Sequence, residues 1–300
     1  MTANSQRYSV LLENVFSLID KKVDAKSREH IHTFGRHFFK NISLDDLENR
    51  NDSDLYGATL SLWNTFSNFD ASSPHVRVFN PEIEKHGWKS SHTIVELILR
   101  DVPFLVDSVR MALNRLGITA HLLIHSPLNI ERDDSNKLVN FLDANQTSNL
   151  RQTVVFIEVD RQTSKADLEQ LTSELHSTID EVSLAVADWQ PMLDKLKAIT
   201  GKVSKAKTLP VDKSHKDTVL RFLDWLSDHN FTLMGYRYYS VSAIEGDHQW
   251  TPDNDSSLGL MKNSISDKPR LLSNLPATAR EEALSQHLLL LTKTNSRSRV

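Results

Sequence analysis

The chain has 300 residues, of which 39% are hydrophobic and 25% charged, and this composition excludes a disordered chain while allowing two modest domains with cores of their own. The formal net charge is -4, basic residues are spread out, and no apolar run approaches the roughly 20 residues of a membrane span, so we expect no nucleic-acid or membrane partner. The absence of cysteine excludes disulfides and thiolate sites, and the polar N-terminus lacks a signal peptide's apolar core, so we expect a cytoplasmic protein.

Residues 1–70 carry the spacing of amphipathic helices. Apolar stripes run along residues 10–19, 31–39 and 55–69. Asp52 and Ser53 can accept from the first free backbone N–H groups of the third stripe. We therefore expect three or four short helices that form an N-terminal helical subdomain.

The most informative stretch runs from His92 to His125. Its aliphatic and β-branched residues at 93–99 predict a strand, and Pro103 suits the first turn of a helix. Apolar residues recur with helical spacing from Leu105 to Leu116. Gly117 can end that helix, and residues 118–124 resume a strand, so the stretch is strand, helix, strand.

Further elements complete a larger unit. A short strand or extended segment is expected at 75–80, strand pieces at 130–132 and 138–142, a strand at 153–159, a helix at 163–180 and a strand at 182–187. Counted from His92, the order of strand, helix, strand, strand, helix, strand predicts a ferredoxin-like βαββαβ domain. Its four-stranded antiparallel sheet would carry both helices on one face. We assign this domain to residues 71–200, including a helix at 188–199.

A second module is predicted downstream. The polar, lysine-rich residues 201–212 read as a linker. The elements expected after it are a helix at 216–228, strands at 231–241, 258–261 and 287–293, and a helix at 277–283. The predicted class is thus α+β throughout, with a second α+β module at 213–300. The chain stops with its last strand barely complete, so we expect a fragment of a longer protein.

Motifs for catalysis or cofactor binding are missing. The glycines form neither G-x-G-x-x-G nor a Walker loop, and Ser108 lies inside a predicted helix rather than in G-x-S-x-G. His30 and His32 diverge on a helix, whereas His121 and His125 share a strand face but lie two pleats apart. We therefore predict no catalytic, cofactor-binding or metal-binding residue in this chain.

The one candidate site is the turn at 100–104 with the helix that follows. The free N–H groups and the positive end of the helix dipole favour an anion, such as the carboxylate of an amino acid. The alternative, favoured by spacing alone, is that Asp101 is a helix cap and Pro103 a helix starter. The candidate effector-binding residues are Asp101, Val102, Phe104, Asp107 and Arg110.

Long phrases of the sequence carry a family resemblance. Residues 95–121 resemble the opening of an ACT domain, a regulatory βαββαβ module, with a strand, D-x-P, a helix and G-I. The phrases RVFNPEIEKHGW (77–88), HTIVELILRDVPFLVDSVRMALNRLG (92–117), FLDWLSDHNFTLMGYRYY (222–239) and LLTKTNSRSRV (290–300) are similar to the N-terminal region of the large bacterial NAD-specific glutamate dehydrogenases. The resemblance runs from about residue 10 to the last residue.

This resemblance implies a regulatory head whose dehydrogenase domain lies far downstream. NAD would be the cofactor of the full-length parent, which converts L-glutamate to 2-oxoglutarate and ammonia, and this segment would hold no cofactor. The expected partners are the parent's own downstream dehydrogenase domains, other subunits of a homo-oligomer, and an amino-acid effector. Residues 213–300 would begin a PAS-like module.

One departure from the family pattern concerns the turn. The common ACT turn has glycine after the proline, whereas this chain has Phe104, whose ring would block or replace a ligand. A pure interaction or oligomerisation module therefore stays open as an alternative, and exposed apolar rows would favour it. A third hypothesis, an enzyme in its own right, would require glutamate-dependent NAD reduction by this chain.

Overall fold

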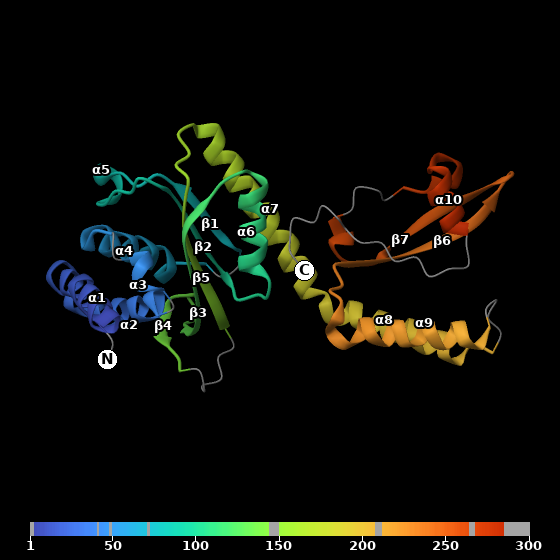
Figure 1. The fold of residues 1–300 in the computed structure, drawn as a ribbon, viewed down its shortest axis with the longest axis horizontal. Helices are drawn as coiled ribbons and strands as arrows, with labels where there is room; N and C mark the ends of the chain where they lie inside the picture. Colours follow the sequence, from blue (N-terminus) through green and yellow to red (C-terminus); the bar gives the residue numbers. More distant parts are fainter. Residues whose placement is uncertain are drawn as a thin grey trace. The chain divides into compact units, whose positions relative to one another are not determined.

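A five-stranded antiparallel sheet organises the first of two units, residues 1–179 and 180–300, into which the chain divides (Figure 1). The computed structural model describes residues 3–40, 42–47, 50–70, 73–143, 150–207, 212–263 and 268–284. The two units are described separately below.

The N-terminal segment is helical, as predicted. Its helices are α1 (Ala3–Lys22), α2 (Ala25–Phe39), α3 (Leu44–Leu47) and α4 (Asp52–Ser67). The side chain of Asp24 accepts hydrogen bonds from the N–H groups of Lys26 and Ser27 and so caps α2. The cap of α4 is Asn51, which accepts from the Ser53 N–H, so the predicted capping by Asp52 and Ser53 is wrong by one residue.

The sheet has the order β1-β2-β5-β3-β4, and all neighbouring strands are antiparallel. Its strands are β1 (His75–Phe79), β2 (Thr93–Arg100), β3 (Ala120–Arg132), β4 (Leu138–Phe141) and β5 (Leu150–Val159). The helices between and after them are α5 (Ile83–His86), α6 (Leu105–Arg115) and α7 (Lys165–Ala187). The strands predicted at 93–99, 118–124 and 153–159 are confirmed, and an antiparallel α+β architecture follows.

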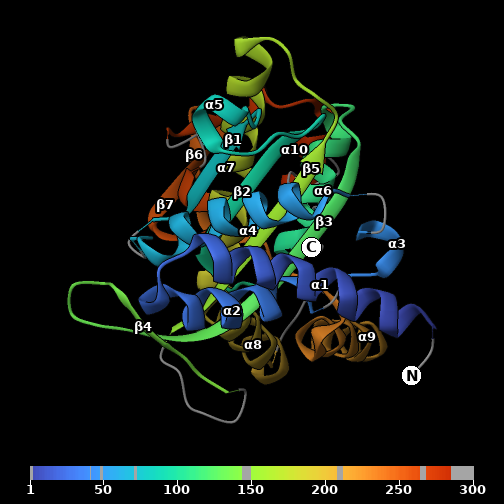
Figure 2. The same cartoon turned by 90° about the vertical axis from the view of Figure 1, so that its left-hand side faces the viewer.

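Both faces of the sheet are covered. One face packs against α6 and α7 through a cluster that includes Val95, Leu97, Val109, Ile157 and Leu175. This confirms that both predicted helices lie on one face. Helices α1, α2 and α4 lie over the opposite face (Figure 2). The two clusters explain why β2 is buried along seven of its eight residues.

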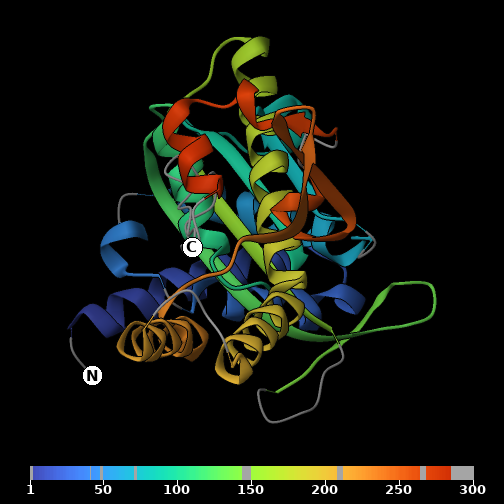
Figure 3. The same ribbon diagram turned by 90° about the vertical axis from the view of Figure 1, so that its right-hand side faces the viewer.

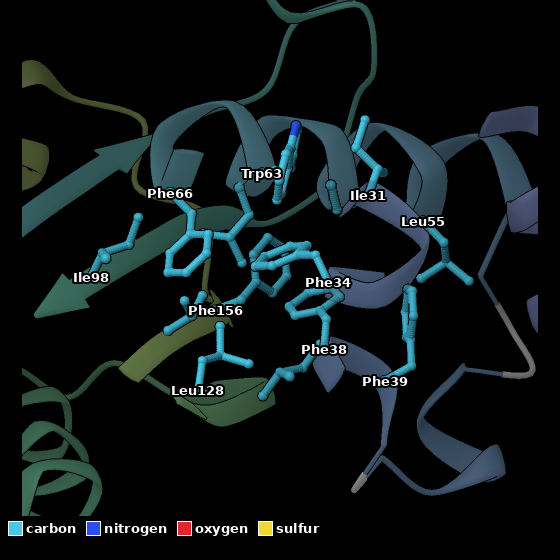
Figure 4. Packing of buried hydrophobic residues seen from close by; sticks show 14 of the residues in the cluster. Ile31, Phe34, Phe38, Phe39, Leu55, Trp63, Phe66, Ile98, Leu128 and Phe156 are labelled. Atoms are coloured by element: carbon cyan, nitrogen blue, oxygen red, sulfur yellow. The ribbon is translucent and has the colours of Figure 1, made fainter. Parts of the chain in front are cut away.

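An aromatic core joins the N-terminal helices to the sheet. Phe34 of α2 stacks on Phe38 and Phe66, with ring centroids 6.0 Å and 5.4 Å away, and Phe38 meets Phe156 of β5 edge-on at 5.8 Å (Figure 4). These four side chains are almost completely buried. The helices and the sheet therefore share one hydrophobic core.

The strand predicted at 182–187 is wrong, because these residues continue helix α7. The buried positions Leu171, Leu175, Ile179 and Val182 keep helical spacing beyond the predicted helix end. The sheet edge beside β2, where the closing strand of a βαββαβ unit would pair, is occupied by β1. The position of the predicted strand at 182–187 is thus filled by β1, which precedes the βαββαβ segment in the chain.

The core also contains a buried carboxylate. Glu96 of β2 is fully buried. Its carboxylate accepts a hydrogen bond from the Ser61 hydroxyl at 2.8 Å and pairs with Nη1 of Arg77 at 3.2 Å. Burial raises the pKa of Glu96, while Arg77 and Ser61 act in the opposite direction.

The second unit combines a helical pair with a three-stranded antiparallel sheet, β6-β7-β8 (Figure 3). Its elements are α8 (Trp189–Lys205), α9 (Lys213–Trp225), a kinked turn (Leu226–Asn230), β6 (Gly235–Ile244), β7 (Asp247–Gly259), β8 (Arg270–Leu271), two short 3-10 helices (Leu260–Asn263 and Leu272–Asn274) and α10 (Ala277–Leu284). Glu245 and Gly246 both have positive φ, which suits the tight turn between β6 and β7.

Several predicted boundaries in this unit change. Residues 201–205, predicted as linker, continue α8, because polar lysines are as compatible with a solvated helix face as with a linker. The strand predicted at 231–241 begins at Gly235, after the kinked turn at Leu226–Asn230. Of the segment predicted as a strand at 258–261, only the first two residues belong to β7. The strand predicted at 287–293 lies outside the described residues.

Among the helices that the structure describes, none combines the length and apolar character needed to cross a membrane.

Candidate functional site

The turn predicted as an effector site lies between β2 and α6 and borders a pocket of about 490 Å³. The structure brings four of the five predicted residues to this pocket. Arg110 lies exposed on α6 and does not line it. The complete lining is Asp101, Val102, Pro103, Phe104, Leu105, Val106, Asp107 and His125.

Asp101 ties the turn to the sheet and does not cap the helix. Its carboxylate lies 2.8 Å from Nε of Arg151 and 3.9 Å from Nε2 of His125, and its N–H donates to the Arg151 carbonyl at 2.9 Å. Burial lowers the pKa of His125, and Asp101 acts against this effect. The interpretation of Asp101 as a cap is therefore wrong.

Helix α6 begins at Leu105, after an N-cap residue, Phe104, that makes no side-chain capping hydrogen bond. Pro103 therefore precedes the helix and does not start it. The first-turn N–H groups of a helix have no partner within the helix, and they can bind a carboxylate. Asp107 already places a negative charge in this turn, so a ligand with both a carboxylate and an ammonium group fits better than a simple anion.

Phe104 adopts the left-handed conformation that glycine favours, with φ 65° and ψ 0°. Left-handed backbone costs a residue with a Cβ roughly 1–2 kcal/mol, and the Phe104 side chain is 45% exposed, so its ring offsets little of this cost. The position where the common ACT turn has glycine thus keeps a glycine-like backbone.

We expect Phe104→Gly to have a free energy of unfolding about 1 kcal/mol above that of Phe104→Ala, because both variants lose the ring and only alanine keeps the strain. Urea denaturation followed by circular dichroism measures the difference. Equal stability of the two variants would contradict the strained turn. The difference in free energy of unfolding between the wild type and Phe104→Ala gives the contribution of the phenyl ring.

The two histidines of each pair lie in different surroundings. His121 and His125 were expected on one strand face, but this is wrong, because a register shift between Ala120 and Leu122 puts an extra residue into β3. His121 lines a pocket beside α4, whereas His125 lines the pocket at the turn. His30 and His32 diverge on α2, as predicted. Within the described ranges, no group of three or more His, Cys, Asp or Glu side chains is arranged to hold a metal ion.

A second pocket, of about 470 Å³, lies on the sheet face covered by α1–α4. We call it the Glu158 pocket, after the buried carboxylate at its base. Arg50 contacts Glu158, and Nδ1 of His92 lies 3.4 Å from the same carboxylate oxygen. The ring of His92 also lies 4.5 Å from that of His121, whose Nε2 is 2.7 Å from a carboxylate oxygen of Asp160. Burial lowers the pKa of His92, with Glu158 acting in the opposite direction.

Sequence reasoning missed this pocket because its residues are far apart in the chain. Arg50 and Glu158 are separated by 108 positions. One signal was present: Glu158 interrupts the apolar run 153–159, as Glu96 interrupts the run 93–99. A carboxylate inside a strand buried on both faces needs a specific partner, so such residues are worth singling out.

Comparison with known proteins gives one family. Residues 34–175 match the family model described as glutamate dehydrogenase, ACT1 domain. The match begins within α2 and ends within α7, so it contains the whole five-stranded sheet and most of the helices that cover it.

Three curated relatives are all described as NAD-specific glutamate dehydrogenase. The protein from Halomonas elongata is 36% identical over 262 residues, which are 87% of this chain and 16% of the relative. The protein from Pseudomonas aeruginosa is 38% identical over 239 residues, 79% of this chain and 15% of the relative. The protein from Mycobacterium tuberculosis is 23% identical over 169 residues, 56% of this chain and 10% of the relative. The chain thus spans about one sixth of the length of the first two.

Proposed function

We propose that this chain is the N-terminal regulatory and assembly segment of an NAD-specific glutamate dehydrogenase, because residues 34–175 match the model of the glutamate dehydrogenase ACT1 domain, and two relatives of that description are 36% and 38% identical to most of the chain. One observation carries the proposal: the matches cover 87% and 79% of this chain but only 16% and 15% of the two relatives. In the full-length parent, other domains would bind NAD and convert L-glutamate to 2-oxoglutarate and ammonia.

The finer fold assignments belong to this proposal. The sheet with α6 and α7 on one face would be an ACT-like domain in which β1 replaces the closing strand. The strands β6–β8 with α10 would begin a PAS-like module. The cysteine-free composition agrees with a cytoplasmic location.

We place the amino-acid effector at the turn between β2 and α6. The helix N-terminus offers N–H groups to the ligand carboxylate, and Asp107 offers a carboxylate to the ammonium group. Such a ligand would act by binding one subunit arrangement of a homo-oligomer more tightly than another.

A pure interaction module is the second candidate, and exposed apolar side chains favour it. Tyr238, Val241 and Ile244 of β6 are 55%, 47% and 38% exposed. Phe222 and Trp225 of α9 stack on each other, and both are also exposed. These surfaces fit contacts with downstream domains or with other subunits.

The decisive experiment uses the full-length enzyme and the variant Asp107→Asn. Glutamate-dependent NAD reduction is followed at a fixed glutamate concentration and increasing concentrations of aspartate or arginine. We expect the concentration of effector that gives a half-maximal change in rate to rise about tenfold. The rate without effector should stay unchanged, because Asp107 is exposed and its carboxylate has no hydrogen bond or ion pair among the described residues.

Arg110→Gln is the matched control, since Arg110 lies on the same helix outside the pocket. An unchanged effector response in Asp107→Asn would remove the effector site from the turn and leave the interaction role. Glutamate-dependent NAD reduction by the 300-residue chain alone would overturn the regulatory assignment itself.

A further inference from the structure

The Glu158 pocket has the features of a built binding site. It lies on the opposite face of the sheet from the turn, between α4, the loop at 88–92 and strands β3 and β5. Its volume of about 470 Å³ falls in the range of small-molecule sites. Buried apolar side chains, among them Phe38, Leu55 and Phe156, lie beneath its polar groups.

Glu158 is the central polar group. Its side chain is only 7% exposed. The oxygen Oε2 meets both Arg50 and His92, whereas Oε1 has no hydrogen-bond partner among the described residues. A carboxylate oxygen accepts up to two hydrogen bonds, so this buried group keeps unused acceptor capacity toward the pocket.

Asp54 adds a second free acceptor. It lies in the first turn of α4, is half-buried and lines the pocket. In the part of the chain that the structure describes, its carboxylate has no hydrogen bond or ion pair. Asn51 caps the same helix, so Asp54 is not needed as the cap.

The charges of the lining favour a cation. The lining contains three carboxylates, Asp46, Asp54 and Glu158, and two basic side chains, Arg50 and Lys89. Arg50 is engaged by Glu158 and by the Asp46 carbonyl, to which its Nε donates at 2.7 Å. The lining also holds His92, shifted toward its neutral form, and His121, which is paired with Asp160. A phosphate or dicarboxylate would meet three carboxylates, whereas an ammonium group would balance the excess negative charge.

We propose that the Glu158 pocket binds a small molecule through an ammonium group, with Glu158 and Asp54 as the acceptors and Arg50 as the residue that positions Glu158. An ammonium group has three donors, which matches two acceptors and a solvent contact. Free amines and amino acids both carry this group, and Lys89 with Ser90 and Ser91 at the loop provides donors for a carboxylate. The proposal does not depend on the effector site at the turn.

Calorimetry with three ligands of equal carbon number tests the proposal on the 300-residue chain. The probes are n-butylamine, L-2-aminobutyrate and butyrate at millimolar concentration. We expect binding heat from at least one of the two ammonium compounds and none from butyrate. Binding of both ammonium compounds identifies amines as the ligand class, and binding of L-2-aminobutyrate alone identifies amino acids.

Two variants locate the binding. Asp54→Asn keeps the fold, because Asp54 has no partner to lose among the described residues, and it should weaken ammonium binding about tenfold. Glu158→Gln should abolish binding, with near-UV circular dichroism as the check on folding. Arg110→Gln, on α6 and outside both pockets, is the matched control and should bind n-butylamine as the wild type does. Absence of heat from both ammonium compounds, binding of butyrate alone, or unchanged binding in Asp54→Asn would each overturn the proposal.

Discussion

Deletion of residues 1–70 is expected to abolish folding of the five-stranded sheet. Helices α1–α4 cover eight buried apolar side chains on one sheet face, and without these helices all eight would meet water: Ile94, Ile98, Leu122, Ile124, Leu128, Ile130, Val154 and Phe156. Each such side chain contributes roughly 1.5–3 kcal/mol when buried. Their loss alone exceeds about 12 kcal/mol, which is comparable with the entire stability of a typical domain.

The measurement compares two fragments by near-UV circular dichroism and urea unfolding. The fragment 71–300 should lack the near-UV signal of the sheet unit and its cooperative transition. The matched fragment 1–187, which retains α1 to α7, should keep both. A cooperative sheet transition in the fragment 71–300 would contradict the shared core and would support an independent helical subdomain at 1–70.

Arg77→Met is expected to lower the free energy of unfolding by about 3 kcal/mol at neutral pH. Glu96 is fully buried, and without Arg77 its carboxylate keeps only the neutral Ser61 hydroxyl as a partner. Breaking a buried ion pair costs roughly 3–5 kcal/mol, and the lower end applies because the Arg77 side chain is 33% exposed.

The pH dependence of this loss has a defined sign. Burial raises the pKa of Glu96 above the ordinary value of 4.5, so the folded state favours the protonated form. The protonated Glu96 side chain contributes its full stability below pH 4.5, and this contribution is lost as the pH rises through the pKa that Glu96 has in the folded state. Removing Arg77 raises the folded pKa further, so the deficit of the variant should be larger at about pH 8 than at about pH 5.

Urea titrations of wild type and Arg77→Met at both pH values measure this difference. In the double variant Arg77→Met with Glu96→Gln, the buried charge is gone, so most of the lost stability should return and the pH dependence should disappear. A deficit that is the same at both pH values would show that Arg77 stabilises the protein by packing rather than by its charge.

The sequence was sufficient for elements with long, uniform patterns. The apolar runs at 93–99 and 153–159 are strands, and the stripes of residues 1–70 are helices. It was insufficient at 182–187, where β-branched and alanine residues fit either structure. The helical spacing from Leu175 through Val182 decides that case, and this stripe becomes visible only when the helix is followed past residue 180.

For the candidate sites, the sequence predicts which residues lie together only where they are neighbours in the chain. Residues 101–107 lie around one pocket because they are neighbours in the chain, so sequence reasoning brought them together. The direction of the Asp101 carboxylate depends on Arg151 and His125, which strand pairing brings close, and no local pattern reveals that. The Glu158 pocket depends on contacts across 108 positions, which periodicity alone does not predict.

The early position of β1 has a consequence for synthesis on the ribosome. Since β1 pairs with β2 at the edge where a closing strand would otherwise lie, every partner of the sheet has been translated once β5 is made. Helices α6 and α7 cover the remaining face, and the described residues of both hydrophobic clusters around this sheet end at Ile179. The first unit can therefore fold while the rest of the polypeptide is still being made, which shortens the time that its apolar strands spend unprotected.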